Sequence, residues 1–510
     1  MDHVLRGLAA NPNLPGEFLS RLVAVAADDE LVWVLAERAD LTPEHVATLA
    51  AKGESAATSL AREGRLTADD VDPEVWPDTA LALLYAGRGR PEWARRFASD
   101  PDPRRRESLA ECPGLPDDVV ERLAADPDVG VVTELALWAP AETAARLAAH
   151  PHAEVRSAVA YNLATPPEVL ARLASSEGLP PARHCLVCDR HATPFVHDPY
   201  CPHIDCMLPP GASCDGSHES TVHTMYMRAS ENPGTPIGAV AHFAAHQSML
   251  LRCAVAARAD LPPDACQVLA ADPMPGVRED LAANPAIGEA VMRRLAADAS
   301  PDVRRGVALN PLVPLDLLAE LTRTAKIGPV LLPRVADASP DEVADLAASP
   351  NPVLRMLVAQ RRDLPPPVRD RLADDTDAKV LFSIAPHPGL SGRQLHAMLD
   401  RHGSRVAAAV AANPDAPAAL LEAVTAYEPP ARKALRAVAA HSNATPAALC
   451  ACLDDTRARR IALTHPALPP HLVAALVAGE DEAAAEAAAA HPALPRRVMA
   501  ELLARGGALL

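Results

Sequence analysis

A short phrase built around Asn-Pro and Leu-Pro recurs along this chain, and its regular spacing constrains the fold more than any other feature. Clear consecutive copies are 25 or 26 residues apart, as from Pro285 to Pro311 and from Pro466 to Pro492. A fixed period of about 20–50 residues is typical of a solenoid, in which each unit stacks on its neighbours. The clearest copies begin at these residues: Asn11, Asn284, Asn310, Asn413, His465 and His491.

Each repeat carries the start and stop signals of a short helix. In Thr165-Pro166-Pro167-Glu168 the threonine suits a helix cap, proline suits the first turn, and the glutamate completes a capping box. The apolar stretch that follows, such as Val169 to Ala174, runs only two or three turns before an Asp-Pro or His-Pro stop. So short a helix is marginal alone and must bury its apolar side against a neighbour. The chain is 49% hydrophobic but only 3% aromatic, so we expect a core of Ala, Leu and Val shared between stacked repeats.

A second phrase, Val-Arg followed by small apolar residues, lies between the stop and the next Asn-Pro. Its copies include Val155-Arg156, Val277-Arg278, Val303-Arg304 and Leu354-Arg355. The six or seven residues available are too few for a long helix, so we expect a single α or 3-10 turn. We expect each arginine to pair with a nearby aspartate or backbone carbonyl, because regular repeat positions mostly serve packing.

The combined pattern resembles that of the leucine-rich repeat variant family. Units of that family run Asp-Pro, Val-Arg with small apolar residues, Asn-Pro, and then Leu-Pro with a leucine-rich helix; Asp272 to Leu295 and Ser300 to Leu321 match best. The resemblance covers about residues 1–180 and 248–510. It implies an all-α, right-handed solenoid of short alternating α and 3-10 helices, and HEAT-like arrays are the close alternative. The stretches that fit least are 52–96, 322–345 and 425–446.

Between the two arrays the composition changes, which suggests three segments. Residues 1–181 and 248–510 are the repeat arrays, and residues 182–247 form a Cys/His-rich insert that holds eight of the 19 histidines. The insert contains a C-x₂-C pair and a C-x₄-C pair, and two close pairs joined by a loop suit a tetrahedral metal site. The candidate metal ligands are Cys185, Cys188, Cys201, Cys206, Cys214, His191 and His203.

The identity of the metal depends on which of these ligands bind. The N-terminus lacks a basic segment followed by an apolar one, so we expect a cytoplasmic protein whose clustered thiols bind metal rather than form disulfides. Unliganded buried thiols are a further alternative. Zinc accepts mixed Cys/His ligands, whereas a 4Fe-4S cluster needs four thiolates, which Cys185, Cys188, Cys201 and Cys206 could supply. Some leucine-rich repeat variant proteins carry a cysteine domain with such a cluster, but before the repeats rather than between them. We therefore favour zinc over iron–sulfur.

The charge and the motifs restrict the function. A formal net charge of −18 argues against nucleic acid as the main partner. The sequence contains no phosphate-binding loop, dinucleotide motif, nucleophile elbow or H-E-x-x-H, so we assign no catalytic or cofactor-binding residue, and no apolar run is long enough to suggest a membrane span. The predicted function is a non-enzymatic scaffold that binds protein partners on the solenoid surface and carries a structural zinc. The alternative is an iron–sulfur redox or sensor protein; an enzyme acting on nucleic acid is disfavoured.

The other cysteines and several histidines have simpler interpretations. We expect the five cysteines outside the insert to be small buried side chains, although two of them are only two residues apart on one predicted helix and so face different ways. We expect four histidines that replace Asn or Asp at repeat boundaries to be turn and cap residues. These residues are Cys112, Cys253, Cys266, Cys450 and Cys452, and His387, His441, His465 and His491.

Overall fold

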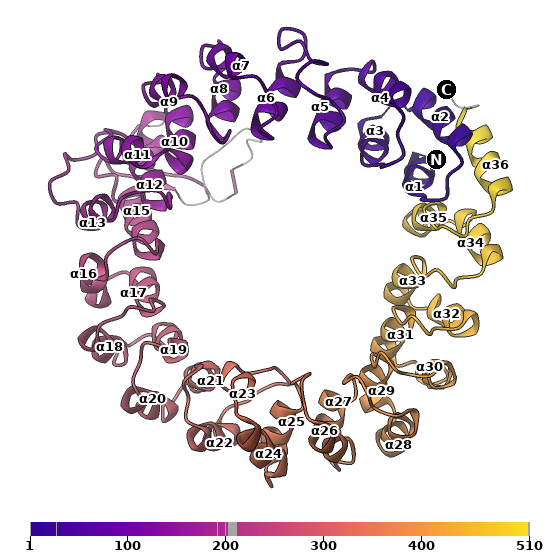
Figure 1. Ribbon diagram of the computed structural model, residues 1–510. Helices are drawn as coiled ribbons and strands as arrows, with labels where there is room; N and C mark the ends of the chain where they lie inside the picture. The colour runs from indigo at the N-terminus through magenta and orange to yellow at the C-terminus, as the bar shows by residue number, and fades with distance from the viewer. Residues whose placement is uncertain (1, 27, 191, 199, 202–211, 508–510) are drawn as a thin grey trace. The chain divides into compact units, whose positions relative to one another are not determined.

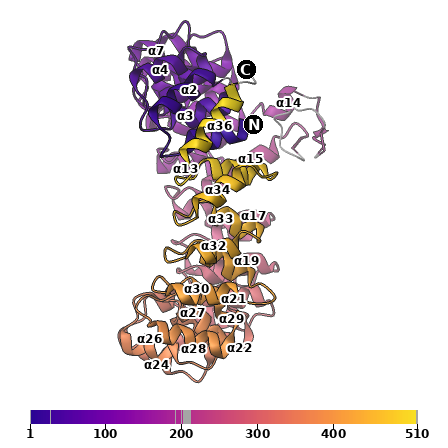
Figure 2. The same cartoon turned by 90° about the vertical axis from the view of Figure 1, so that its right-hand side faces the viewer.

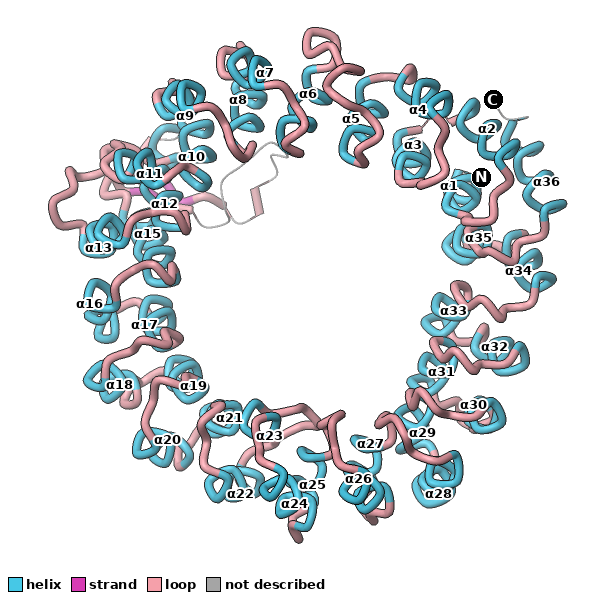
Figure 3. Tube along the Cα trace, in the orientation of Figure 1, coloured by secondary structure: helices cyan, strands magenta, loops and turns pink. Residues whose placement is uncertain are grey.

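The chain folds into a succession of short α-helices. The structure is a computed structural model that describes residues 2–26, 28–190, 192–198, 200–201 and 212–507. These residues form 36 α-helices, one 3-10 helix and one two-stranded sheet (Figures 1 and 3). The predicted fold class, an all-α repeat solenoid, is confirmed.

The helices divide between two compact units. Unit 1 comprises Met1–Leu66 and Ile327–Leu510, and unit 2 comprises Thr67–Lys326. Both boundaries fall in stretches where the repeat phrase is weakest, 52–96 and 322–345. The units differ from the three segments expected from composition, because each contains repeats from both sides of the insert.

Unit 1 contains both ends of the chain. Its helices are α1 (Asp2–Ala10), α2 (Gly16–Val25), α3 (Asp29–Ala36), α4 (Pro43–Ala50), α5 (Glu54–Arg62), α23 (Pro333–Ala336), α24 (Pro340–Ala348), α25 (Pro352–Val358), α26 (Pro366–Ala373), α27 (Ala378–Ile384), α28 (Gly392–His402), α29 (Ser404–Ala411), α30 (Ala418–Thr425), α31 (Arg432–Ala439), α32 (Pro446–Cys452), α33 (Thr456–Ala462), α34 (Pro470–Val477), α35 (Glu482–Ala489) and α36 (Arg496–Gly507).

Unit 2 contains the Cys/His-rich insert. Its elements are α6 (Pro77–Tyr85), α7 (Pro91–Phe97), α8 (Pro103–Ala110), α9 (Asp117–Ala124), α10 (Val129–Trp138), α11 (Ala141–Leu147), α12 (Ala153–Tyr161), α13 (Pro167–Ser175), α14 (Leu186–Arg190), β1 (Phe195–Val196), β2 (Ser213–Cys214), α15 (Glu219–Glu231), α16 (Ile237–Val240), the 3-10 helix η1 (Ala241–Ala245), α17 (Met249–Ala256), α18 (Pro263–Leu269), α19 (Pro275–Ala283), α20 (Glu289–Ala296), α21 (Pro301–Leu309) and α22 (Leu315–Thr324). Most of the helices lie in two rows: row A is α6, α8, α10, α12, α15, α17, α19 and α21, and row B is α7, α9, α11, α13, α16, α18, α20 and α22 (Figure 1).

Each repeat is a pair of α-helices, which corrects one expectation. The Val-Arg phrase was expected to form a single α or 3-10 turn, but it lies inside α-helices such as α19 and α21, which are nine residues long. These helices begin at the proline before the phrase, Pro275 and Pro301, because proline fits the first turn of a helix. The Val-Arg phrase and the small apolar residues after it therefore form a full row A helix rather than a single turn. None of the described helices has the length and apolarity needed to cross a lipid bilayer.

A column of buried asparagine and histidine side chains joins consecutive repeats. Asn310 Nδ2 donates to the carbonyl oxygens of Ala282 at 3.0 Å and Asn284 at 2.7 Å in the preceding repeat. His465 Nε2 lies 3.0 Å from the carbonyl oxygen of His441, and its Nδ1 accepts from the backbone N–H of Ala467 at 3.1 Å. We call the place that Asn or its substitute holds in the repeat phrase the ladder position. All four histidines predicted as turn residues occupy it. The side chains of His441, His465 and His491 also bond through Nε2 to the preceding repeat, whereas His387 Nδ1 lies 2.7 Å from the carbonyl oxygen of Pro388.

The repeated arginines form ion pairs and bind carbonyl groups, as predicted. Arg278 pairs with Asp298 through two hydrogen bonds of 2.7 and 3.0 Å, and its Nη1 donates to the carbonyl oxygen of Asp272 at 2.6 Å. Arg106, Arg252 and Arg355 make the same pairing with the aspartate 20 residues further on. These guanidinium groups serve the packing of adjacent repeats rather than a ligand.

Within unit 1 the first repeat packs on the last. Asn11 Nδ2 donates to the carbonyl oxygens of Ala489 at 3.0 Å and His491 at 2.7 Å, which is the ladder pattern of successive repeats. Helix α1 contacts α35, and α2 lies beside α36 (Figures 1 and 2). The approach is close, because a Cβ atom on Gly7 would lie 2.0 Å from the carbonyl oxygen of Glu486. The two ends of the chain therefore meet as if they were neighbouring repeats.

Candidate metal centre

The insert leaves the solenoid and returns to it without breaking the stack. Asn232 Nδ2 donates to the carbonyl oxygens of Ala160 at 3.0 Å and Asn162 at 3.1 Å, which are 72 and 70 residues earlier. For Asn310 the matching separations are 28 and 26 residues, so the insertion adds 44 residues to one repeat. Helix α15 packs directly on α12, and the repeats resume at α15, inside the segment 182–247 assigned to the insert from composition.

Three cysteines and one histidine of the insert converge on one point. The Sγ atoms of Cys185, Cys188 and Cys214 and a ring nitrogen of His218 all lie within 4.8 Å of one another. Cys185 precedes α14 and Cys188 lies in it, Cys214 is on β2, and His218 is the residue before the first turn of α15. Figure 2 shows α14 projecting beyond the row A helices α15, α17 and α19. All but Cys188 are buried.

Backbone N–H groups donate hydrogen bonds to two of the cysteine sulfur atoms. The backbone N–H of Cys185 donates to Cys188 Sγ at 3.1 Å, and that of Gly216 donates to Cys214 Sγ at 3.3 Å. Such N–H groups stabilise negative charge on sulfur and orient it. The pairing of β1 with β2 sets Cys214 opposite Phe195, and His218 adopts a left-handed conformation with φ of 59°. The turn into α15 thereby brings the histidine to the thiols.

The distances fit a single tetrahedral ion. The His218 Nδ1 atom lies 3.6 Å from Cys214 Sγ and 3.8 Å from Cys188 Sγ. With Zn–S of about 2.3 Å and Zn–N of about 2.0–2.1 Å, tetrahedral geometry puts sulfur and nitrogen about 3.6 Å apart. Burial raises the pKa of the Cys185 thiol to about 12, so an unliganded thiolate is unfavourable there. A bound cation would displace the thiol proton and stabilise the buried thiolate.

A polar cluster around the buried His152 ties the cysteines to helix α12. His152 Nε2 lies 2.9 Å from Asp189 Oδ2, beside Cys188, and its Nδ1 lies 2.9 Å from Glu154 Oε2. Glu154 also accepts from the backbone N–H of Leu186 at 2.9 Å. Burial lowers the pKa of His152, but the carboxylates of Glu154 and Asp189 outweigh it and the net direction is upward. The segment from Cys185 to Cys188, which we call the knuckle, is therefore anchored to the repeat before the insertion. His218 belongs to the repeat after it.

The predicted ligands divide into three groups. The structure brings Cys185, Cys188 and Cys214 together, and it adds His218, which the predicted set did not include. Cys201 is described but is not part of this cluster, while Cys206, His191 and His203 lie outside the described residues. The spacing of Cys214 and His218, C-x₃-H directly before a helix, was the signal that could have identified the histidine. The C-x₄-C spacing instead favours Cys201 and Cys206.

The cysteines outside the insert are mostly covered. Cys112, Cys266 and Cys452 are buried, as predicted, and Cys253 is half-buried. Cys450 is exposed, contrary to the expectation of burial, because it lies two residues from Cys452 on α32 and faces the other way.

Comparisons with known proteins add no argument about function. No protein-family model matches the chain, and no curated protein matches it. A solved leucine-rich repeat variant with a novel repetitive motif is 18% identical, with 51% of this chain and 87% of that chain covered and a TM-score of 0.32. An engineered protein is 15% identical over 93% of this chain and 98% of its own, with a TM-score of 0.14. A homology model of the full-length AP-3 complex is 10% identical over 99% and 89%, with a TM-score of 0.18. The TM-scores are low, so the solenoid assignment stands on the helices and the ladder alone.

Proposed function

We propose that this protein is a non-enzymatic interaction scaffold in which a structural zinc ion holds the insertion against the solenoid. The observation that carries the proposal is the convergence of Cys185, Cys188, Cys214 and His218 at distances suited to one tetrahedral ion. The ion would join a knuckle anchored on α12 to the first turn of α15. It would thus hold the start and the end of the insertion together between two stacked repeats.

The donor set supports a structural rather than a catalytic ion. Catalytic zinc sites keep three protein ligands and an open position, whereas four protein ligands fill a tetrahedral shell. The site is also packed against apolar side chains, including Ala153, Val187 and Phe195, which limit the approach of a substrate. We therefore assign the centre to stability and the solenoid surface to partner binding.

Zinc suits this donor set better than a 4Fe-4S cluster. Cys₃His is one of the usual structural zinc sets, while a 4Fe-4S cluster takes four thiolates. A cluster also places each thiolate on a different iron, so its ligands must surround a larger body than one ion. The ligand atoms here lie within 4.8 Å of one another, which favours a single ion.

Metal analysis of protein purified without oxygen tests the proposal, together with its absorption spectrum. We expect about one zinc per chain and no charge-transfer band in the visible blue. Cys214→Ser and His218→Ala should lose the zinc, whereas Cys201→Ser and the exposed Cys450→Ser serve as matched controls that retain it. Stoichiometric iron with a broad visible band would refute the zinc assignment, and zinc lost equally from the Cys201 variant would refute the ligand set.

A further inference from the structure

Part of row A in unit 2 carries acidic and aromatic side chains at equivalent repeat positions. The residues immediately before the ladder position are Glu111, Trp138, Tyr161 and Glu231, on or directly after α8, α10, α12 and α15. Consecutive members of this helix series are in contact. Residues four positions earlier share the same helix face, and they include Glu107 and Glu134. We call these six residues the acidic stripe.

Five of the six side chains of the acidic stripe are exposed, and no basic group pairs with its carboxylates among the described residues. Trp138 and Tyr161 are 61% and 55% exposed, in a chain with only four tryptophans and five tyrosines. Among the residues that the structure describes, none of the four stripe glutamates forms an ion pair. Burial and the nearby charge of Glu134 raise the pKa of both Glu107 and Glu111, so these carboxylates repel one another.

Packing does not require these residue types. In unit 1 the residues before the ladder positions Asn413, His441 and His491 are all alanine. Alanine therefore satisfies the same place in the fold. Large exposed aromatic and like-charged side chains at this place point to binding rather than to stability.

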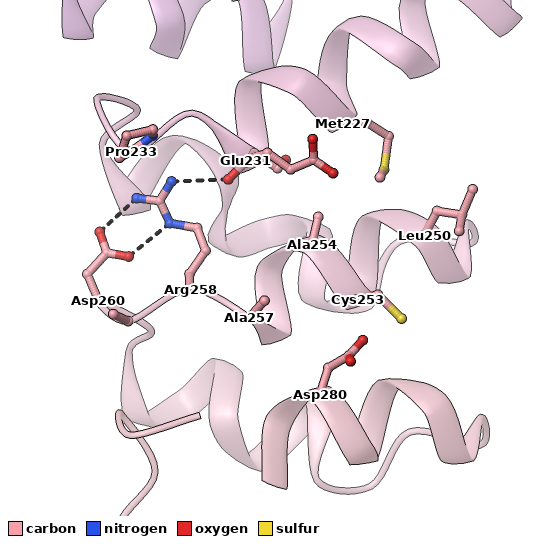
Figure 4. Close-up of a pocket in the computed structure, with 12 residues that line it drawn as sticks. Met227, Glu231, Pro233, Leu250, Cys253, Ala254, Ala257, Arg258, Asp260 and Asp280 are labelled. Carbon is pink, nitrogen blue, oxygen red and sulfur yellow. Dashed lines mark hydrogen bonds and ion pairs between the residues drawn. The ribbon is translucent and has the colours of Figure 1, made fainter. Parts of the chain in front are cut away.

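A groove continues the stripe between α15 and α17. It has a volume of about 810 Å³, and its lining includes Met227, Leu250 and Ala254. Figure 4 shows Glu231 on the α15 side and Asp280 of α19 on the other side of α17. The adjacent Arg258 does not neutralise them, because its guanidinium pairs with Asp260 and donates to the carbonyl oxygens of Ser230 and Asn232.

We propose that the acidic stripe and this groove bind a basic segment of a partner protein, with lysine or arginine side chains between the carboxylates and their aliphatic parts on the aromatic and apolar surface. Charge complementarity selects this occupant. The Tyr161 ring already stacks with a guanidinium of the same chain, since Arg228 Cζ lies 5.6 Å from the ring centroid. The stripe spans four stacked helices, about 27 Å at typical axis spacings, which an extended peptide of about eight residues covers. The proposal names the partner class of the proposed scaffold and rests on that function.

Fluorescence anisotropy with the full-length protein and a labelled decapeptide of alternating lysine and alanine tests the proposal. We expect binding that weakens as salt rises, and no binding of a glutamate–alanine decapeptide. The triple variant E107Q/E111Q/E134Q should weaken lysine-peptide binding roughly tenfold, since it removes three attractive charges. The triple variant E92Q/E142Q/E168Q removes the same charge from α7, α11 and α13 of row B and should change binding less than about twofold. Trp138→Ala should weaken binding without a change in charge.

Several outcomes would overturn the proposal. Equal weakening by the two triple variants would mean that only net charge matters. Displacement of the peptide by spermidine, with the same dependence on the stripe residues, would make the occupant a polyamine. Loss of self-association in E107Q/E111Q/E134Q would make it a second copy of this chain, and binding of an RNA oligonucleotide to the stripe would make it nucleic acid. Circular dichroism and zinc content of every variant separate the two proposals: zinc retained without peptide binding refutes only the stripe, and peptide binding without zinc refutes only the metal.

Discussion

The repeated Arg–Asp pair shows how one residue type serves packing along the whole array. Arg278 and Asp298 join adjacent repeats by a bidentate pair, and both side chains are largely buried. The hydrogen bonds from Arg278 outweigh the desolvation of Asp298 and hold the pKa of that carboxyl below its usual range. The sequence predicted this role because arginine recurs at a fixed place in the repeat, with aspartates at the following stop.

Acid should therefore weaken the array. A carboxyl whose pKa is lower in the folded than in the unfolded state stabilises the fold above its unfolded value, about pH 4. That contribution is lost as the pH falls through the lower folded value. We expect the urea midpoint of unfolding to be steady above about pH 5 and to fall below about pH 4. Asp298→Asn should lower the free energy of unfolding by about 1–3 kcal/mol at neutral pH and reduce the acid dependence. An unchanged pH profile in this variant would contradict the assigned role.

At the scale of elements, the insertion is an addition to one repeat rather than a break between two arrays. The 44 extra residues lie between α13 and α15, and Asn232 still bonds to the repeat before them. The composition change indicated where the insertion lies. It did not indicate that α15 belongs to the solenoid, because His223 of α15, His242 of η1 and His246 carry the histidine-rich composition past the point where the repeats resume.

The insertion should therefore be removable. Deletion of residues 175–218 leaves four residues, 219–222, ahead of the shortened α15, as many as separate α20 from α21. We expect the shortened protein to keep its helical circular dichroism per residue and its acid profile, and to lose the bound metal. Loss of helical structure would mean that the solenoid depends on the deleted insertion.

The elements that carry the candidate ligands explain which of these residues the sequence could identify. The knuckle of Cys185 and Cys188 is a local pattern and is readable from spacing alone. His218 reaches the site through the left-handed turn at the start of α15, and α15 itself is held on α12, which lies far away in the sequence. Sequence spacing alone offered several histidines and no means of choosing among them.

In the molecule as a whole, the contact between the chain ends could not be predicted from the sequence pattern. Asn11 and His491 are 480 residues apart, and each matches the ordinary repeat phrase. Terminal repeats of solenoids usually need a polar cap. Here the first and last repeats cover each other through α1 and α35, with a further ion pair between Arg496 and Glu17 at 2.6 Å.

A substitution at Gly7 tests this contact between the ends. Gly7→Ala adds a Cβ that would lie 2.0 Å from the Glu486 carbonyl oxygen, so the helices must separate; such overpacking typically costs about 1–3 kcal/mol. We expect hydrogen exchange to accelerate in α1 and in α35 together. Gly16→Ala, which meets open space at the start of α2, is the control and should leave both helices protected. Faster exchange in α1 alone would show that α35 does not depend on the contact.

X-ray absorption at the zinc edge of the purified protein reports directly on the proposed metal centre. The proposed zinc site predicts one zinc with three sulfur ligands at about 2.3 Å and one nitrogen at about 2.0–2.1 Å. The same measurement on His218→Ala should show the nitrogen replaced or the zinc absent. A shell of four sulfurs, an open position occupied by water in the wild-type protein, or iron with iron neighbours would refute a Cys₃His zinc site.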